Sequence, residues 1–313
     1  MNYLGVYMQV DDKVKLAISL CNRDAGKLYQ FNYLYPFTTE NISAYIDMFD
    51  LKDKSSLVVG SSCDQVFNAI LRNSKNITLC DVCPFTREYF YLKVALIKLL
   101  NREQYLKFLC YNDYPIIFFK NKWVFDKSVF DTIYPYLNII DSEVAYFWEQ
   151  LFKKINGSEI RKKLFVSDEC SYKELNIMNR YLRSDDAFNT LSDKIDDVNI
   201  EFLLGDIFDV SINKKYDNIF LSNIATYYKL DKFKTLFLKL NNNLNDNGSM
   251  LVSYLYDTDV NIFSNNSIYN LNQVRRVLSD KLTLSSFVGS RGLFVNSCDF
   301  KDSVIIYKKV KKI

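Results

Sequence analysis

The chain has 313 residues, enough for one large domain, and 49% of them are hydrophobic, which is ample material for a core. A net charge of +3 is too small to indicate a nucleic-acid surface, so no nucleic-acid partner is expected. The sequence contains no histidine, which excludes Ser-His-Asp and Cys-His mechanisms and histidine-ligated zinc. Any chemistry must therefore use carboxylates, tyrosine, lysine or a reactive cofactor.

The cysteines point to a reducing compartment. There are seven, an odd number, and they are scattered, which does not fit a disulfide framework. Cys80 and Cys83 have C-x-x-C spacing, but Cys80 lies within a predicted strand and no second pair exists, so burial is favoured and no metal site is expected. No apolar run reaches the roughly 18 residues of a membrane span, and no signal peptide opens the chain. We expect a soluble, cytoplasmic protein without a transmembrane segment.

Residues 57–84 predict a strand, a tight turn, a helix and a second strand. The first strand ends at Gly60, the helix covers Gln65–Leu71, and the second strand covers Ile77–Asp81. A buried strand that ends in glycine and leads into a helix points backbone N–H groups beyond the strand end. Asp81 follows Gly60 by 21 residues, close to the spacing at which a carboxylate accepts both ribose hydroxyls of a nucleoside. This unit predicts a nucleoside cofactor on a Rossmann-type sheet.

Further helices and strands alternate along the rest of the chain. The helices are predicted at 85–100, 231–244 and 271–278, a turn at 245–248, and the strands at 199–204, 218–221, 250–255, 282–288 and 303–307. Alternation of helices with apolar strands indicates an α/β protein with a doubly wound, mostly parallel sheet of seven strands. The last two strands are joined without a helix, which predicts an antiparallel strand at one edge. This is the order expected of the class I methyltransferase fold.

Residues 101–198 are too long for an ordinary connection. Helices are predicted there at 104–110, 142–155 and 172–195, and an aromatic hairpin at 114–125. We interpret 101–198 as a mainly helical, aromatic-rich insertion in a Rossmann-type domain made of 51–100 and 199–313. A helical segment, 1–50, is expected to pack over the cofactor end. A substrate cap and a structural or homodimer-forming element are alternative roles for the insertion.

Four strand ends carry the candidate site, because ligands of open α/β sheets bind beyond the carboxyl ends of the strands. Gly60 would let a cofactor approach the backbone, Asp81 would accept from its ribose, and Asp206 from an adenine amino group. Asn223 and Tyr227 would orient donor and acceptor as the catalytic pair. The full set of predicted cofactor contacts is Gly60, Ser61, Ser62, Asp64, Asp81, Asp206, Ser222 and Asn223.

Each carboxylate also has an ordinary interpretation. Asp64 could cap the following helix, and Asp81 and Asp206 could be solvated turn residues. The number of glycines in the loop after the first strand distinguishes the candidate cofactors. A dinucleotide would need more glycine beside its pyrophosphate than Gly60 alone provides. S-adenosylmethionine carries no phosphate, so this loop favours S-adenosylmethionine.

The sequence also resembles a particular family. The runs 58–64, 69–73, 77–81, 92–93, 97–99, 221–224 and 247–248, with Pro84, are similar to S-adenosylmethionine-dependent 3-amino-3-carboxypropyl transferases of betaine-lipid synthesis. The resemblance spans about 55–110 and 200–256, although a second loop glycine is replaced by Ser62 or Cys63. It implies transfer of the aminocarboxypropyl arm to a small-molecule or lipid-like nucleophile. Methyl transfer, common on this fold, and a non-catalytic binding protein are the alternatives.

Overall fold

The computed structural model describes residues 8–22, 33–38, 40–109, 124–166, 172–256, 286–289 and 302–309. The helix predicted at 271–278 lies outside these residues, as does 114–123 of the predicted hairpin. No helix in the described ranges is both long enough and apolar enough to cross a bilayer.

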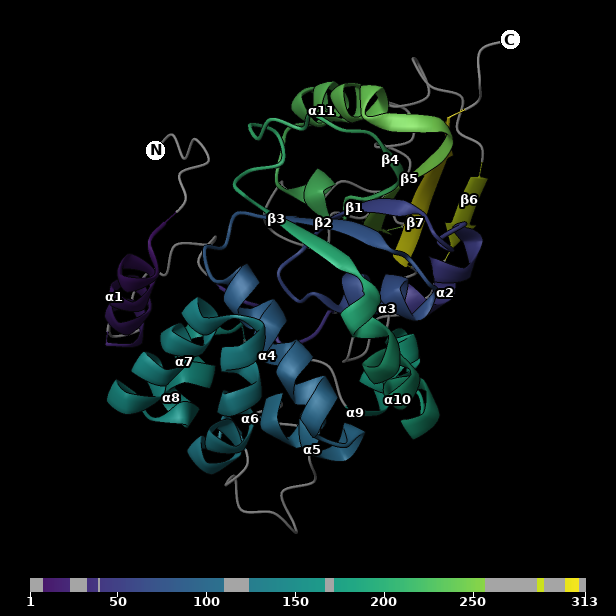
Figure 1. Ribbon diagram of the computed structural model, residues 1–313. Helices are drawn as coiled ribbons and strands as arrows, with labels where there is room; N and C mark the ends of the chain where they lie inside the picture. Colours follow the sequence, from purple (N-terminus) through teal and green to yellow (C-terminus); the bar gives the residue numbers. More distant parts are fainter. Residues whose placement is uncertain are drawn as a thin grey trace.

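A single sheet with the strand order β3-β2-β1-β4-β5-β7-β6 forms the centre of the molecule (Figure 1). Neighbouring strands from β3 to β5 are parallel, whereas β7 runs antiparallel to both β5 and β6. The predicted α/β class, with a doubly wound, mostly parallel sheet of the class I methyltransferase type, is confirmed. The strands are β1 Ser55–Val59, β2 Asn76–Asp81, β3 Asn199–Leu204, β4 Tyr216–Phe220, β5 Leu244–Tyr256, β6 Ser286–Gly289 and β7 Asp302–Lys308.

Both faces of the sheet are buried under helices. Successive residues of a strand point to opposite faces, and in β1 Leu57 joins one hydrophobic cluster while Val58 joins the other. Helix α11 (Leu230–Asn242) covers the first face; α3 (Asp64–Leu71) and α4 (Thr86–Leu99) cover the second (Figure 1). Strand β1 lies between β2 and β4. Strands β2 and β3 are therefore added on one side of β1, and β4 and β5 on the other, and a crevice forms at the strand ends where the two sides meet.

The predicted turn at 245–248 is wrong, because β5 already begins at Leu244. The pairing of β4 with β5 shifts register between Tyr216 and Asn218, and Asn247 takes a positive φ of 62°. An irregular, bulged strand start thus replaces a turn.

The described part of 101–198 is mainly helical, and it packs on the α4 side of the sheet (Figure 1). Trp148 is fully buried and donates its ring N–H to the carbonyl of Glu88 on α4 at 2.9 Å. Two helices here were not predicted, and the helix predicted at 172–195 is broken by a 3₁₀ turn. The helices are α5 Arg102–Leu109, α6 Lys127–Ile140, α7 Ser142–Lys154, α8 Gly157–Leu164, α9 Tyr172–Met178 and α10 Asp185–Lys194, with 3₁₀ turns at Arg180–Leu182 and Ile195–Asp197.

The N-terminal segment contributes α1 (Val10–Cys21) and α2 (Ile42–Tyr45), the latter continued by a 3₁₀ turn at Ile46–Met48. Helix α1 packs against α7 and α8 rather than over the strand ends. Its Lys13 forms a buried ion pair with Glu88 of α4, with 2.6 Å between ammonium and carboxylate. The N-terminal segment and the insertion are therefore anchored to the same helix.

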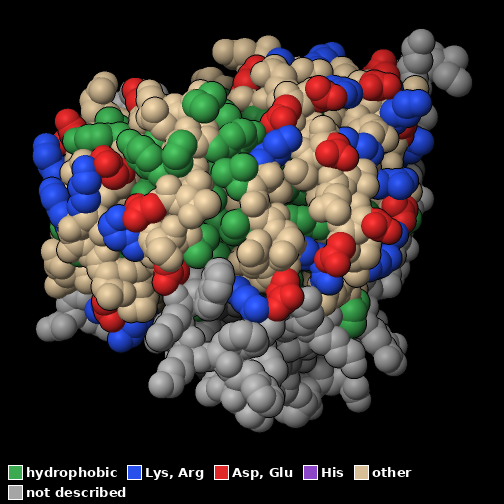
Figure 2. All heavy atoms as spheres, turned by 60° about the horizontal axis from the view of Figure 1, so that its bottom comes forward, with side chains coloured by type: hydrophobic (Ala, Val, Ile, Leu, Met, Phe, Trp, Pro, Cys, Tyr) green, Lys and Arg blue, Asp and Glu red, His purple; other side chains and the backbone are tan. Residues whose placement is uncertain are grey.

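Figure 2 shows the molecule turned so that the bottom of Figure 1 comes forward. On this face acidic and basic side chains are interspersed, and hydrophobic side chains are exposed between them. Ile139 of α6 is 81% exposed and Tyr146 of α7 is 39% exposed. Association of two copies through the insertion stays a prediction.

Candidate functional site

A cavity lies at the carboxyl ends of β1 to β4, with an empty volume of about 1070 Å³ including its open mouth. The structure brings most of the predicted site residues together there. Each strand end supplies part of the wall: Gly60, Ser61 and Ser62 after β1, Asp81 at the end of β2, Asp206 after β3, and Ser222 and Asn223 after β4. No described residue of 101–198 lines this cavity, so the cap role of the insertion stays a prediction.

Gly60 provides a bare surface at the base of the cavity. Its φ of +144° is a conformation that side-chain-bearing residues rarely adopt, and a Cβ built there would have no atom within 4 Å. The space above this backbone is thus open, and a ligand can approach it closely. Gly205, after β3, has a similar φ of +142°, but its Cβ would lie 2.8 Å from Val210.

Asp81 presents a carboxylate beside Gly60. The backbone N–H of Cys83 donates to Asp81 Oδ1 at 2.7 Å and fixes its orientation. Burial raises the pKa of Asp81 from 3.8 to about 6, although the Cys83 N–H works in the opposite direction. Asp81 is therefore ionised at neutral pH and able to accept hydrogen bonds from a ligand.

Asp206 is held by two donors on one oxygen. The backbone N–H of Phe208 donates to Asp206 Oδ1 at 2.9 Å, and the hydroxyl of Tyr228 donates to the same oxygen. Burial, together with this bond to Asp206, raises the pKa of Tyr228 far above its usual value, so the phenol stays protonated. Tyr228 and Asp206 form a fixed part of the wall below the mouth.

The N-terminal segment supplies a further wall, called here the N-terminal wall. Sequence reasoning missed its residues, which are Tyr33, Tyr35, Thr38 and Glu40. This segment was predicted to be helical, but residues 33–38 form no helix, and Leu34 pairs with Phe165 in an isolated bridge. The only sequence signal was Pro36 within an aromatic run, which disfavours helix in the residue before it.

Glu40 is the most enclosed carboxylate of the wall, 7% exposed. Ser222, which has a positive φ of 52°, donates its hydroxyl to Glu40 Oε1. Tyr45 and Ser253 donate to Oε2 at 3.1 and 2.8 Å. Burial raises the pKa of Glu40, and the three hydroxyls oppose that change.

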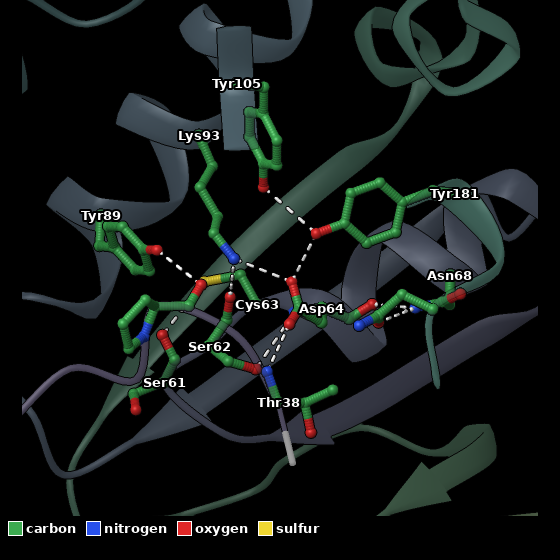
Figure 3. Close-up of polar contacts among 12 residues, drawn as sticks. Thr38, Ser61, Ser62, Cys63, Asp64, Asn68, Tyr89, Lys93, Tyr105 and Tyr181 are labelled. Atoms are coloured by element: carbon green, nitrogen blue, oxygen red, sulfur yellow. Dashed lines mark hydrogen bonds and ion pairs between the residues drawn. The ribbon is translucent and has the colours of Figure 1, made fainter. Parts of the chain in front are cut away.

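Asp64 does not line the cavity. Figure 3 shows its carboxylate facing Lys93, Tyr181 and Thr38 instead. Its carboxylate accepts from Lys93 Nζ at 2.8 Å, from the Tyr181 hydroxyl at 2.7 Å and from the Thr38 backbone N–H at 2.5 Å. Lys93 Nζ also donates to the carbonyl of Ser62 at 2.7 Å. A cofactor contact from Asp64 would require it to leave these donors, so its role here is to hold two cavity walls. It makes no side-chain cap on α3 either.

The predicted catalytic pair lies near the mouth. Asn223 and Tyr227 both line the cavity after β4, and Tyr227 is 44% exposed. The hydroxyls of Tyr35 and Tyr227 form a hydrogen bond, which joins the N-terminal wall to the β4 wall. Burial, and secondarily Tyr227, raises the pKa of Tyr35 to about 12.

The charge of the cavity is one-sided. Its described lining contains three carboxylates, those of Glu40, Asp81 and Asp206, and neither lysine nor arginine. Within the described ranges, no group of three or more Cys, Asp or Glu side chains could hold a metal ion. A cationic ligand with hydroxyl groups and without phosphate suits such a surface.

No protein-family model matches the sequence, and no curated protein matches it. Solved structures do match. N-methyltransferase NodS from Bradyrhizobium japonicum WM9, in complex with S-adenosyl-L-homocysteine, is 12% identical with a TM-score of 0.41, covering 97% of this chain and all of that one. Magnesium protoporphyrin IX methyltransferase ChlM from Synechocystis PCC 6803 is 6% identical with a TM-score of 0.38, covering 86% and 80%. Values this low carry no argument about activity, and the fold assignment rests on the strand order itself.

The Asp64–Lys93 pair predicts a specific stability effect. Lys93→Met should lower the free energy of unfolding by about 3–5 kcal/mol, because it leaves a fully buried carboxylate without its cation. Lys98→Met on the same helix removes a cation whose partner, Asp196, is 55% exposed, and should cost less than about 1 kcal/mol. Urea unfolding measures both. Equal losses for the two variants would contradict the role given to Lys93.

Proposed function

We propose that the cavity binds S-adenosylmethionine and that the chain is an S-adenosylmethionine-dependent transferase. The observation that carries the proposal is the combination of the open Gly60 backbone, Asp81 at the next strand end, and a described lining with carboxylates but no basic residue. A sulfonium nucleoside brings a positive charge and ribose hydroxyls. A dinucleotide would instead bring two phosphate charges into a cavity that already carries negative charge.

In this proposal, different residues of the cavity contact different parts of S-adenosylmethionine. Asp81 accepts hydrogen bonds from the ribose, Asp206 accepts from the adenine amino group, and Gly60 allows close approach of the backbone. Ser222 and Asn223 lie after β4, toward the reacting end. The Tyr35 and Tyr227 rings at the mouth would contact a small-molecule or lipid-like acceptor.

A histidine-free site suits this chemistry. The sulfonium supplies a carbon with an activated leaving group, so the transfer is a displacement that depends mainly on alignment. Asn223 and Tyr227 hold donor and acceptor in line. The resemblance to aminocarboxypropyl transferases favours transfer of the 3-amino-3-carboxypropyl group. Methyl transfer is the alternative, because it is common on this fold.

Binding is the first test, and Asp81→Ala is the variant. Calorimetry should show S-adenosylmethionine binding to the wild type and a loss of about 1–3 kcal/mol in Asp81→Ala, the cost of leaving hydrogen-bonding groups unpaired. Asp209→Ala, at an exposed position outside the cavity lining, is the matched control and should bind as the wild type does. Unchanged affinity in a folded Asp81→Ala variant would refute the ribose contact.

The raised pKa of Asp81 predicts a pH dependence of binding. Because the ionised carboxylate accepts hydrogen bonds from the ribose hydroxyls, affinity should be highest above pH 6 and fall below it, by at most about tenfold per pH unit.

The stability of the unliganded protein should respond to pH in the opposite sense. An acid whose pKa is raised by folding contributes stability at low pH, and this contribution is lost as the pH rises through about 6. Asp81→Asn should flatten both profiles in calorimetry and thermal unfolding. A profile that keeps its shape in this variant would assign the titration elsewhere.

Product analysis identifies the transferred group. Aminocarboxypropyl transfer releases methylthioadenosine, whereas methyl transfer releases S-adenosylhomocysteine. Asn223→Ala should lower the rate more than it lowers cofactor affinity, if Asn223 acts mainly in the transition state. S-adenosylhomocysteine as the sole enzyme-dependent product would decide for a methyltransferase, and absence of binding would decide for neither.

A further inference from the structure

The backbone of the N-terminal wall is hydrogen-bonded to the insertion. The N–H of Leu34 donates to the carbonyl of Leu164 at 2.9 Å, and the N–H of Val166 donates to the carbonyl of Leu34 at 2.9 Å. The neighbours of Leu34 on both sides, Tyr33 and Tyr35, line the cavity. The insertion therefore holds the part of the wall that carries these two tyrosines.

A second attachment runs through the carboxylate of Asp64. The Tyr181 hydroxyl, from the 3₁₀ turn of the insertion, donates to Asp64 Oδ1 at 2.7 Å, and the N–H of Thr38 donates to Oδ2 at 2.5 Å. Figure 3 shows the Asp64 carboxylate between Tyr181 and Thr38. Both Tyr181 and Asp64 are fully buried, so water cannot replace the bond between them. Tyr181 is thus one carboxylate away from the N-terminal wall.

The turn that carries Tyr181 is itself fixed on both sides. Asn68 of α3 donates its amide to Asn179 Oδ1 at 2.9 Å and accepts from the N–H of Arg180 at 2.8 Å. The Arg180 guanidinium donates to the carbonyl of Ser43 at 3.3 Å and forms an ion pair with Asp47. Ser43 and Asp47 follow the N-terminal wall in the sequence, so the turn grips the segment beyond the wall as well.

We infer that the insertion positions the N-terminal wall from outside the cavity, through the turn 179–182, and that Tyr181 is the positioning residue of this turn. No described residue of the insertion lines the cavity, yet its contacts at Leu34, Asp64 and Asp47 hold the chain before and after Glu40. A wall held in place before binding spares a ligand the cost of ordering it. The effect on ligand affinity rests on the proposed function, whereas the effect on the wall itself does not.

Tyr181→Phe is the test variant, and Tyr105→Phe is its matched control. Tyr105 is fully buried in the same aromatic cluster, and its hydroxyl lies 3.2 Å from that of Tyr181. Because Tyr181 gives its single proton to Asp64, Tyr105 is the donor between the two hydroxyls. Tyr105→Phe therefore removes a buried hydroxyl and leaves the bond from Tyr181 to Asp64 in place.

Two measurements compare these variants. Amide hydrogen exchange of the unliganded protein, read by mass spectrometry, should be about fivefold faster or more in the N-terminal wall of Tyr181→Phe, and within about twofold of the wild type in Tyr105→Phe. By calorimetry, the Kd of S-adenosylhomocysteine should rise about 3- to 10-fold in Tyr181→Phe and less than about twofold in Tyr105→Phe. Urea unfolding first establishes that both variants are folded.

Arg180→Met tests the second grip of the turn in a variant that leaves the buried charges intact. It should speed exchange in α2 and in the 3₁₀ turn after it, because the bonds to Ser43 and Asp47 are lost. Arg183→Met, at the exposed end of the same turn, is the control and should exchange as the wild type does.

The outcomes separate this inference from the proposed function. Unchanged exchange of the wall in a folded Tyr181→Phe variant, or equal acceleration in Tyr105→Phe, would overturn the inference. Faster exchange of the wall with unchanged affinity for S-adenosylhomocysteine would overturn the role of Tyr181 in the site. If the wild type does not bind S-adenosylhomocysteine, the proposed function is overturned, and the exchange measurement alone decides whether the turn positions the wall.

Discussion

The ion pair between Lys93 and Asp64 decides where the cavity walls stand. Both side chains are fully buried, and the Lys93 ammonium also lies over the rings of Phe37 and Tyr89, 4.7 and 5.0 Å from their centroids. Removing two charges from water is expensive, so such a pair is a poor source of net stability. Its effect is positional: through the Thr38 N–H and the carbonyl of Ser62 it sets the spacing between the N-terminal wall and the loop after β1.

That spacing determines which carboxylates meet at the strand ends. Asp81 ends β2 and Asp206 closely follows β3, whereas Glu40 comes from the N-terminal segment, in which Thr38 and Pro36 are hydrogen-bonded to α3 and α4. Ser222 completes the arrangement in a backbone conformation that few side-chain-bearing residues adopt, which aims its hydroxyl at Glu40. The hydrogen-bond acceptors of this histidine-free site are therefore carboxylates, two from the strand ends and one from the N-terminal segment.

The sequence predicted what local patterns encode and missed what distant contacts decide. A glycine after an apolar strand and an aspartate at the end of the next one are readable from spacing, and the structure has both Gly60 and Asp81 in the cavity lining. Asp64 also follows the first strand and its glycine, and the sequence pattern alone suggests a cofactor contact. Its buried partner Lys93 is 29 residues away, so only tertiary packing shows that Asp64 does not line the cavity. Likewise α6 contains Pro135, a residue that argues against helix, and packing against α7 and α4 overrides it.

The order of the strands has a consequence for how the protein folds. Central pairing joins β1 to β4, and Ser55 bonds to Asp217 across 162 residues of sequence. Pairing β2 with β3 must likewise close a chain segment that holds the insertion. Closing long loops costs entropy before any contact repays it, which makes such sheets slow to form. Helix α10, which precedes β3, packs on α3 and α4, the helices on either side of β2 in the sequence. The cavity, built from four strand ends, is then complete only when the last of these distant pairings has formed.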